Sequence, residues 1–99
     1  MTAYENKIAE DARLFILQEL EAQVDGRLNE LLLQRLLDQR YGIARSREWV
    51  QTQMRKLAEL EAVKLIEGAF LIADIERPGR DHVACRSIVA GVTRPTEIE

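Results

Sequence analysis

The stretch that most constrains the fold of this chain runs from Ser46 to Glu76. Residues 46–61 have the apolar spacing of an amphipathic helix. Residues 63–76 then hold two short apolar segments on either side of Gly68-Ala69, which is the pattern of a tight two-stranded hairpin. The rest of the chain is expected to be organised around this helix and hairpin.

Two helices are expected before this stretch. Apolar residues recur at helical spacing between positions 4 and 23, and Asp25-Gly26 then breaks the pattern. Asn29 is a good N-cap for a second helix, because its side chain can accept from a backbone N–H of the first turn. Gly42 is well placed to end that helix.

The end of the chain is expected to form one more helix and a tail. Pro78, which suits a first helical turn, begins the helix, and Gly91 ends it. Its inward side is expected to hold Val83, Ala84 and Ile88, with Cys85 as a further candidate. Residues 91–99 contain a proline and charges, which predicts a loose or intermolecular tail.

The expected order of elements is helix, helix, helix, hairpin, helix. Such a chain is mostly α-helical with a small β-hairpin, and the order is that of a winged helix-turn-helix domain. Ninety-nine residues are the usual size of one domain and too few for two sizeable cores. We therefore predict a single winged-helix domain at residues 1–90.

The composition excludes several classes of protein. Apolar residues make up 46% and charged residues 31%, as in globular rather than disordered chains. No apolar run approaches the roughly 20 residues that span a bilayer, and the N-terminus lacks the apolar segment of a signal peptide. The single cysteine excludes an internal disulfide and fits the reducing cytoplasm, where we expect the protein to lie away from membranes.

Catalytic and metal-binding chemistry has little support in this sequence. The one histidine, His82, and the one cysteine, Cys85, lie three positions apart and can share a helix face. A thiolate–imidazole nucleophile also needs a pocket and an orienting group, and two soft ligands do not complete a tetrahedral zinc site. No glycine-rich phosphate loop is present. We expect no enzyme activity, no metal and no cofactor.

Residues 40–56 form a strongly basic segment in a chain whose formal net charge is −3. The segment holds five basic residues and one acid, Glu48, which leaves +4. It lies where a helix-turn-helix presents its second helix to the major groove of DNA. We expect amide and hydroxyl groups to reach base edges, Arg55 to read guanine and the other cations to hold phosphates. The predicted contacts to double-stranded DNA are Arg45, Ser46, Arg47, Gln51, Thr52, Arg55 and Lys56.

Acidic residues on the same surface favour a different function. Glu48 and Glu59 are expected on the outward face of the third helix, and Glu67 lies in the hairpin, where many wings carry arginine or lysine. Carboxylates at these positions repel phosphates. Because a winged helix can also serve as a protein–protein module, the alternative function is a non-enzymatic adaptor that binds another protein and not DNA.

Leu14 and Leu17 fall outside the main apolar side of the first helix, among charged and polar residues. They are either single exposed apolar residues, which are common, or part of a second contact face. In the second case they form a dimer interface, since first helices often join winged-helix proteins into homodimers. We expect a homodimer, which sets two recognition helices against half-sites about one helical turn apart.

The order and spacing of several segments resemble a family of small winged-helix proteins encoded by Mu-like transposable phages and prophages. The segments YENKIAEDARLFILQEL, LNELLLQRLL and SREWVQTQMRKLAELEAVKL are similar to the first, second and third helices of that family. The segment IERPGRDHVACRSIVAGVTRP resembles its strand, turn and last helix, with the G-V-x-R-P finish. The resemblance spans nearly the whole chain.

This resemblance implies a phage-encoded protein. Through a looser likeness to bacterial winged-helix regulators, it also implies a role in transcription regulation. The genes of such phage proteins lie near terminase and morphogenesis genes, which is compatible with an adaptor in assembly or packaging. The sequence departs from the shared pattern at Glu61 and Cys85, where glycine is common, and at Glu76, where threonine is common.

Overall fold

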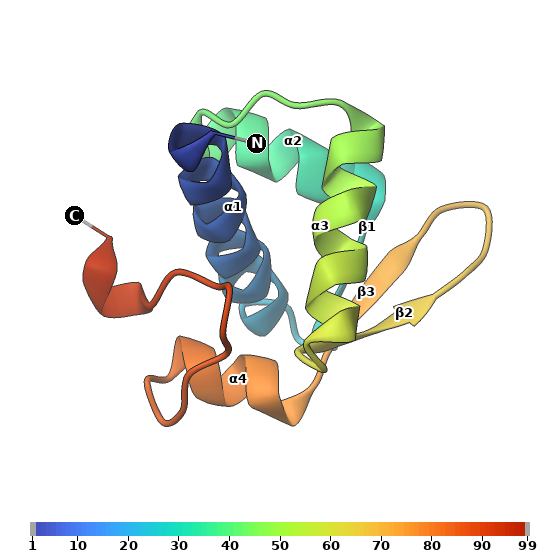
Figure 1. Cartoon of the computed structure of the whole chain (residues 1–99). Helices are drawn as coiled ribbons and strands as arrows, with labels where there is room; N and C mark the ends of the chain where they lie inside the picture. Colours follow the sequence, from blue (N-terminus) through green and yellow to red (C-terminus); the bar gives the residue numbers. More distant parts are fainter. Residues whose placement is uncertain (1, 99) are drawn as a thin grey trace.

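Four helices and a small antiparallel sheet make up the computed structural model, which describes residues 2–98 (Figure 1). The prediction of a mostly helical chain with a small hairpin is confirmed, and the arrangement is compatible with a winged helix. The helices are α1 (Ala3–Glu21), α2 (Glu30–Tyr41), α3 (Arg47–Glu59) and α4 (Arg77–Val83), followed by the short 3-10 helix η1 (Pro95–Glu97). The strands are β1 (Arg27–Asn29), β2 (Val63–Ile66) and β3 (Ile72–Ile75).

Polar caps determine where the first three helices begin. The side chains of Thr2, Asn29 and Ser46 each accept a hydrogen bond from the backbone N–H three residues further on. The caps predicted at Asn29 and Ser46 are therefore confirmed, as is the helix end at Gly42, which has a left-handed φ of 69°. After α3, Glu61 has a left-handed φ of 63°, a conformation that glycine adopts more readily than glutamate does.

The sheet contains one strand that the sequence pattern did not predict. Both β1 and β2 pair antiparallel with β3, so the strand order is β1-β3-β2. Leu28 of β1 and Leu65 of β2 both lie opposite Ala73 of β3. β1 has only three residues, which is too short for an alternating pattern to be visible in the sequence. The predicted hairpin is thus the larger part of a three-stranded sheet.

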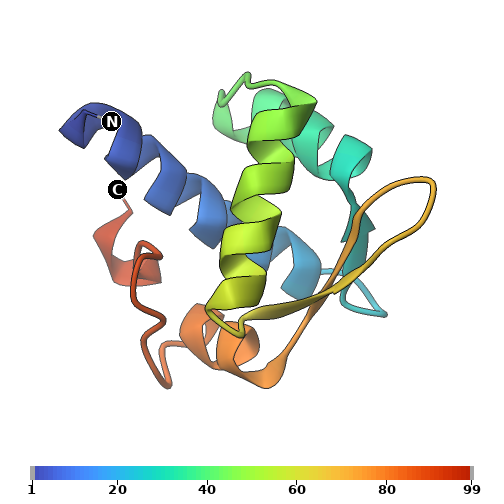
Figure 2. The ribbon, with the colours of Figure 1, turned by 45° about the vertical axis from the view of Figure 1, so that its right-hand side comes forward.

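α1 lies in the middle of the molecule and packs against α2, α3, α4 and β3 (Figures 1 and 2). Leu14 and Leu17 on this helix have an exposed fraction of 0%. A Cβ atom on Gly79 of α4 would lie 3.1 Å from the Leu17 side chain, so α4 covers this side of α1 directly. The prediction that Leu14 and Leu17 are exposed, singly or as a dimer interface, is wrong because other elements cover the second face of α1.

One apolar core joins the helices to the sheet. Its largest fully buried apolar side chains are Leu14, Ile16, Leu17, Leu20, Leu33, Leu37, Val50, Met54 and Leu57. The helices keep polar side chains on their other faces, as amphipathic helices around a shared core do. None of the helices described between residues 2 and 98 has the length and apolar character that crossing a membrane requires.

α4 is shorter than predicted. It ends at Val83, and Cys85, two residues further on, has a left-handed φ of 62°, which a helix cannot contain. Ala84, Cys85 and Ile88 are consequently exposed, so their predicted inward orientation is wrong. His82 and Val89 are the buried side chains of this region.

The predicted tail is bound to α1 over part of its length. Val92 and Thr93 are buried, and the backbone N–H of Thr93 donates to the carbonyl oxygen of Glu10. The guanidinium of Arg13 donates to the carbonyl oxygen of Gly91 over 2.7 Å. The Thr93 hydroxyl donates to the carboxylate of Asp11 over 2.6 Å. The prediction of a loose or intermolecular tail from residue 91 is therefore wrong for these residues.

Candidate functional site

The residues predicted to contact DNA lie on α3 and on the turn that precedes it, beside the β2–β3 hairpin (Figure 2). Thr52, Arg55 and Lys56 are exposed, whereas Arg47 and Gln51 are half-buried. The structure thus brings the predicted residues together but divides them into two groups. One group is tied to the interior through a buried carboxylate, and the other group pairs with carboxylates at the surface.

The buried carboxylate belongs to Glu30, the first residue of α2, which has an exposed fraction of 1%. Arg47 of α3 forms an ion pair with it, and the side-chain amide of Gln51 donates to its Oε1 over 2.7 Å. The backbone N–H of Leu71, just before β3, donates to its Oε2. Glu30 therefore joins α2 and α3 to the loop end of the hairpin, at the start of β3. The sequence analysis missed this residue, because an acid in a first helical turn looks like an ordinary response to the helix dipole.

The carboxylate of Glu30 is ionised despite its burial. Burial alone raises the pKa of a carboxyl group, but hydrogen bonds from Arg47, the Leu71 N–H and Gln51, together with the charge of Arg47, hold the pKa of Glu30 below its usual range. The guanidinium carbon of Arg47 also lies 5.5 Å from the centre of the Phe70 ring. Arg47 thus contacts both an anion and an aromatic ring, and its first role is to fix α3 to its neighbours.

The outer cations pair with surface carboxylates. Arg55 lies 3.3 Å from the carboxylate of Glu67 in the hairpin, and Lys56 lies 3.7 Å from Glu59 one turn along α3. Both pairs are largely exposed. Exposed ion pairs contribute at most about 1 kcal/mol, so a phosphate can replace either carboxylate without a large loss of stability. These cations are available to an anionic ligand, but the carboxylates beside them reduce the local positive potential.

The remaining predicted contacts have local partners as well. Arg45 lies 3.5 Å from the carboxylate of Glu5 and 5.6 Å from the centre of the Trp49 ring. The hydroxyl of Thr52 donates to the carbonyl oxygen of Glu48 over 3.0 Å, which leaves the oxygen free to accept. The hydroxyl of Ser46 accepts from the N–H of Trp49 as the helix cap, so its role is structural.

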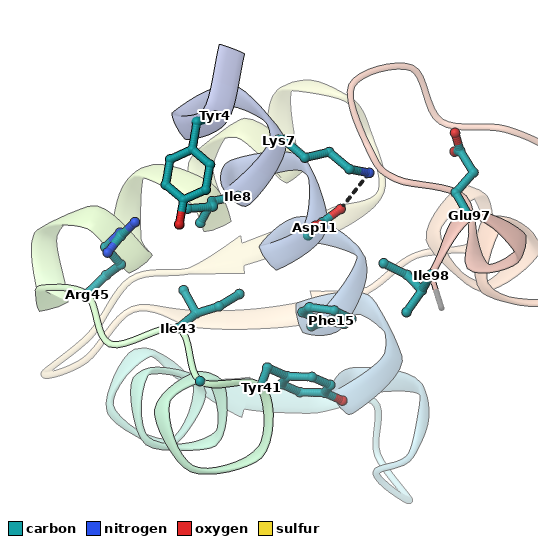
Figure 3. Close-up of a pocket in the computed structure, with 11 residues that line it drawn as sticks. Tyr4, Lys7, Ile8, Asp11, Phe15, Tyr41, Ile43, Arg45, Glu97 and Ile98 are labelled. Carbon is teal, nitrogen blue, oxygen red and sulfur yellow. Dashed lines mark ion pairs between the residues drawn. The ribbon is translucent and has the colours of Figure 1, made fainter. Parts of the chain in front are cut away.

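A second candidate site is a groove of about 560 Å³ between the N-terminal half of α1, the α2–α3 turn and the end of the chain (Figure 3). The rings of Phe15 and Tyr41 stack along it with their centres 4.0 Å apart. The sides include Tyr4, which is 72% exposed, and Ile98. An ion pair of 3.0 Å between Lys7 and Asp11 lies at its edge. The groove combines aromatic surface with a few charges, as sites for apolar ligands or peptide side chains do.

His82 and Cys85 do not form a catalytic pair in this structure. Nδ1 of His82 accepts from the N–H of Val89 over 2.9 Å, and Nε2 faces the carbonyl oxygen of Thr93 at 2.9 Å. Both ring nitrogens are thus used by the main chain, while Cys85 is exposed. Within residues 2–98, no group of three or more histidine, cysteine, aspartate or glutamate residues is arranged to hold a metal ion.

Comparisons with known proteins give no information about these sites. A scan of protein-family models, a search of curated proteins and a search of solved structures each give no significant match. The α3 surface and the aromatic groove are therefore the two candidate sites, and each is supported by its own geometry.

Proposed function

We propose that this chain is a winged-helix protein that binds double-stranded DNA through the outward side of α3, as the resemblance to regulator-like phage proteins implies. The observation that carries the proposal is the position of α3, which lies on the outside of the molecule with the β2–β3 hairpin beside it as a wing (Figure 2). In winged helix-turn-helix proteins this helix enters the major groove.

The exposed contacts in this proposal are fewer than the contacts expected from the sequence. Arg45, Arg55 and Lys56 are the cations whose carboxylate partners a phosphate can replace, and Thr52 is the exposed polar side chain among them. Three phosphate contacts give a slope of about −3 for the logarithm of the binding constant against the logarithm of salt concentration. With Glu48 and other acids on the same face, we expect weak binding that is measured best at low salt.

The test is a salt titration of duplex binding by fluorescence anisotropy, with a labelled duplex of randomised sequence. The double variant Arg55→Ala/Lys56→Ala is expected to bind more weakly and to reduce the slope by about two. The matched control is Arg77→Ala/Arg86→Ala, which removes the same charge from exposed side chains in and after α4. Arg47→Ala is unsuitable, because it also leaves Glu30 buried without its cation.

Two results would overturn the proposal. One is a wild-type protein that binds no duplex at low salt while its circular dichroism spectrum is that of a folded helical protein. The other is a control variant that loses as much affinity as the α3 variant, since binding would then follow net charge and not the α3 surface.

The aromatic groove favours a second candidate function, a protein adaptor without DNA binding. Phe15 and Tyr41 offer a stacked aromatic wall to an apolar side chain of a partner. A titration of short hydrophobic peptides followed by NMR tests this function. Shift changes that gather at Phe15, Tyr41 and Ile43, and that weaken in a Tyr4→Ala variant, support it. Absent or scattered changes count against it.

A further inference from the structure

We infer that Gln51 determines part of the sequence specificity of the α3 surface and that Glu30 is its positioning residue. In this arrangement Gln51 presents its carbonyl oxygen to the bases and prefers adenine or cytosine over guanine or thymine at one position of one strand. The inference rests on the proposed DNA binding and names the base class that the same site selects.

The orientation of the Gln51 amide follows from the chemistry of its partner. Nε2 of Gln51 donates to Oε1 of Glu30 over 2.7 Å. An ionised carboxylate only accepts hydrogen bonds, so the end of the amide that faces Glu30 is the NH₂ group and the carbonyl oxygen points the other way. A neutral amide or hydroxyl in place of Glu30 would accept either end of the glutamine.

Glu30 cannot turn to release the amide. Its side chain is 1% exposed, and its two oxygens receive Arg47, Gln51 and the backbone N–H of Leu71. A rotation of the carboxylate would break several charge-assisted hydrogen bonds inside the protein, which are stronger than neutral ones. The amide of Gln51 is therefore attached to a fixed support before any ligand arrives.

The carbonyl oxygen of Gln51 is free to meet a ligand. It has no hydrogen-bond partner among residues 2–98, and no buried side-chain nitrogen or oxygen atom in that range lacks one, so this oxygen reaches the surface. Gln51 lies one helical turn before Arg55 and next to Thr52, the exposed residues of the proposed contact set. The free acceptor thus lies on the side of α3 that faces the groove in the proposed complex.

A free acceptor selects bases by their major-groove edges. Adenine presents the N6 amino group and cytosine the N4 amino group, and both donate to a carbonyl oxygen. Guanine and thymine present the carbonyl oxygens O6 and O4 at the corresponding places, which repel another acceptor. We expect a preference of about tenfold for adenine or cytosine, within the range that one good base contact gives.

The test is selection of duplexes from a randomised pool, followed by measured affinities for the selected site and its single-base variants. Wild-type protein is expected to enrich adenine or cytosine at one position, and Gln51→Ala to lose that preference. Glu30→Gln replaces the carboxylate by an amide of the same shape. The Gln51 amide can then turn over, so the base preference at the same position should become weaker. Gln39→Ala, which removes an exposed amide from α2, is the control and should keep the preference.

The outcomes separate this inference from the function on which it rests. If folded wild-type protein binds no duplex, the proposed function fails and the inference fails with it. If wild-type protein binds and Gln51→Ala selects the same bases with the same discrimination, the inference alone is overturned. Thermal unfolding of each variant accompanies the selection. If Glu30→Gln does not fold, Gln51→Ala decides the question alone, because Arg47 and the Leu71 N–H still pair with Glu30 when the half-buried Gln51 side chain is shortened.

Discussion

Among single residues, Glu30 connects three separate elements of the fold. Its carboxylate receives hydrogen bonds from α3 and from the residue before β3, while its own backbone belongs to α2. A buried charge of this kind is stable only while its partners remain, because an unpaired buried carboxylate costs several kcal/mol. The basic residues of α3 therefore have different structural roles. Arg47 stabilises the fold, and Arg55 and Lys56 remain at the surface.

Arg47→Ala is expected to lower the free energy of unfolding by about 2 kcal/mol. This is less than the loss for a wholly buried ion pair, because the Arg47 side chain is partly exposed. Urea unfolding followed by circular dichroism measures the change. Arg55→Ala, which breaks only an exposed pair, should change the same free energy by less than about 0.5 kcal/mol. Equal effects of the two substitutions would contradict the structural role of Arg47.

Ionisation of Tyr41 is expected to lower the stability of the fold at high pH. Burial, the hydrogen bond to the Glu19 carboxylate and its charge raise the pKa of Tyr41 to about 12. Because the folded pKa lies above the ordinary value of 10.0, this contribution to stability is complete below pH 10 and is lost as the pH rises toward 12. In a Tyr4→Phe variant, Tyr41 is the one remaining tyrosine, and its tyrosinate absorbance should rise near pH 12. A rise centred at pH 10 in the folded protein would show that this network is absent.

At the scale of elements, α4 is placed by a close approach that only glycine permits. A Cβ atom at Gly79 would lie 2.5 Å from the carbonyl oxygen of Ala62 and 3.1 Å from side-chain carbons of Ile75 and Leu17. α4 therefore sits directly on α1, the sheet and the turn between α3 and β2. This contact also explains the burial of Leu17, which the pattern of α1 alone did not indicate.

Gly79→Ala is expected to lower the free energy of unfolding by about 1–3 kcal/mol, because the added methyl group meets backbone that cannot move easily. Thermal and urea unfolding measure the loss. The control is Gly68→Ala in the hairpin loop, where the nearest atom to the added Cβ is 3.8 Å away. If the two substitutions lower the free energy of unfolding equally, the close contact at Gly79 does not stabilise the fold.

Local chemistry made some elements predictable, and tertiary contacts decided the others. Asn29 and Ser46 could be identified as caps because capping is a property of a few consecutive residues. The burial of Leu14 depends on elements far along the chain, and β1 exists only because β3 pairs with it. For the candidate site, the sequence indicated which cations lie near α3 but not which of them Glu30 holds inside.

At the scale of the whole molecule, the end of the chain is a strap that connects α4 to α1. His82 at the end of α4 binds the carbonyl oxygen of Thr93, and the hydroxyl of Thr93 binds Asp11 on α1. Arg13 of α1 holds Gly91 from the other side. A domain boundary drawn at residue 90 from the sequence would cut through this strap, because its contacts join residues about 80 positions apart.

A chain that ends at residue 90 is therefore expected to have a lower melting temperature than the full chain, by about 5–10 °C for a loss of one to two kcal/mol. The loss follows from the exposure of His82 and the removal of the buried side chains Val92 and Thr93. Differential scanning calorimetry measures the shift. A chain that ends at Arg94 retains the strap and should melt close to the full-length protein. Equal melting of the two shortened chains would refute the role of residues 91–93.

The exposed thiol of Cys85 has a practical consequence for measurements of the oligomeric state. Cys85 is the one cysteine in the sequence, and it lies at the surface beyond α4. Air oxidation can join two molecules through this atom and double the mass without any packed interface. Light scattering with a reducing agent, or on a Cys85→Ser variant, therefore reports only non-covalent association. The same thiol accepts one maleimide dye per molecule, which places a fluorescent reporter next to the strap without any substitution.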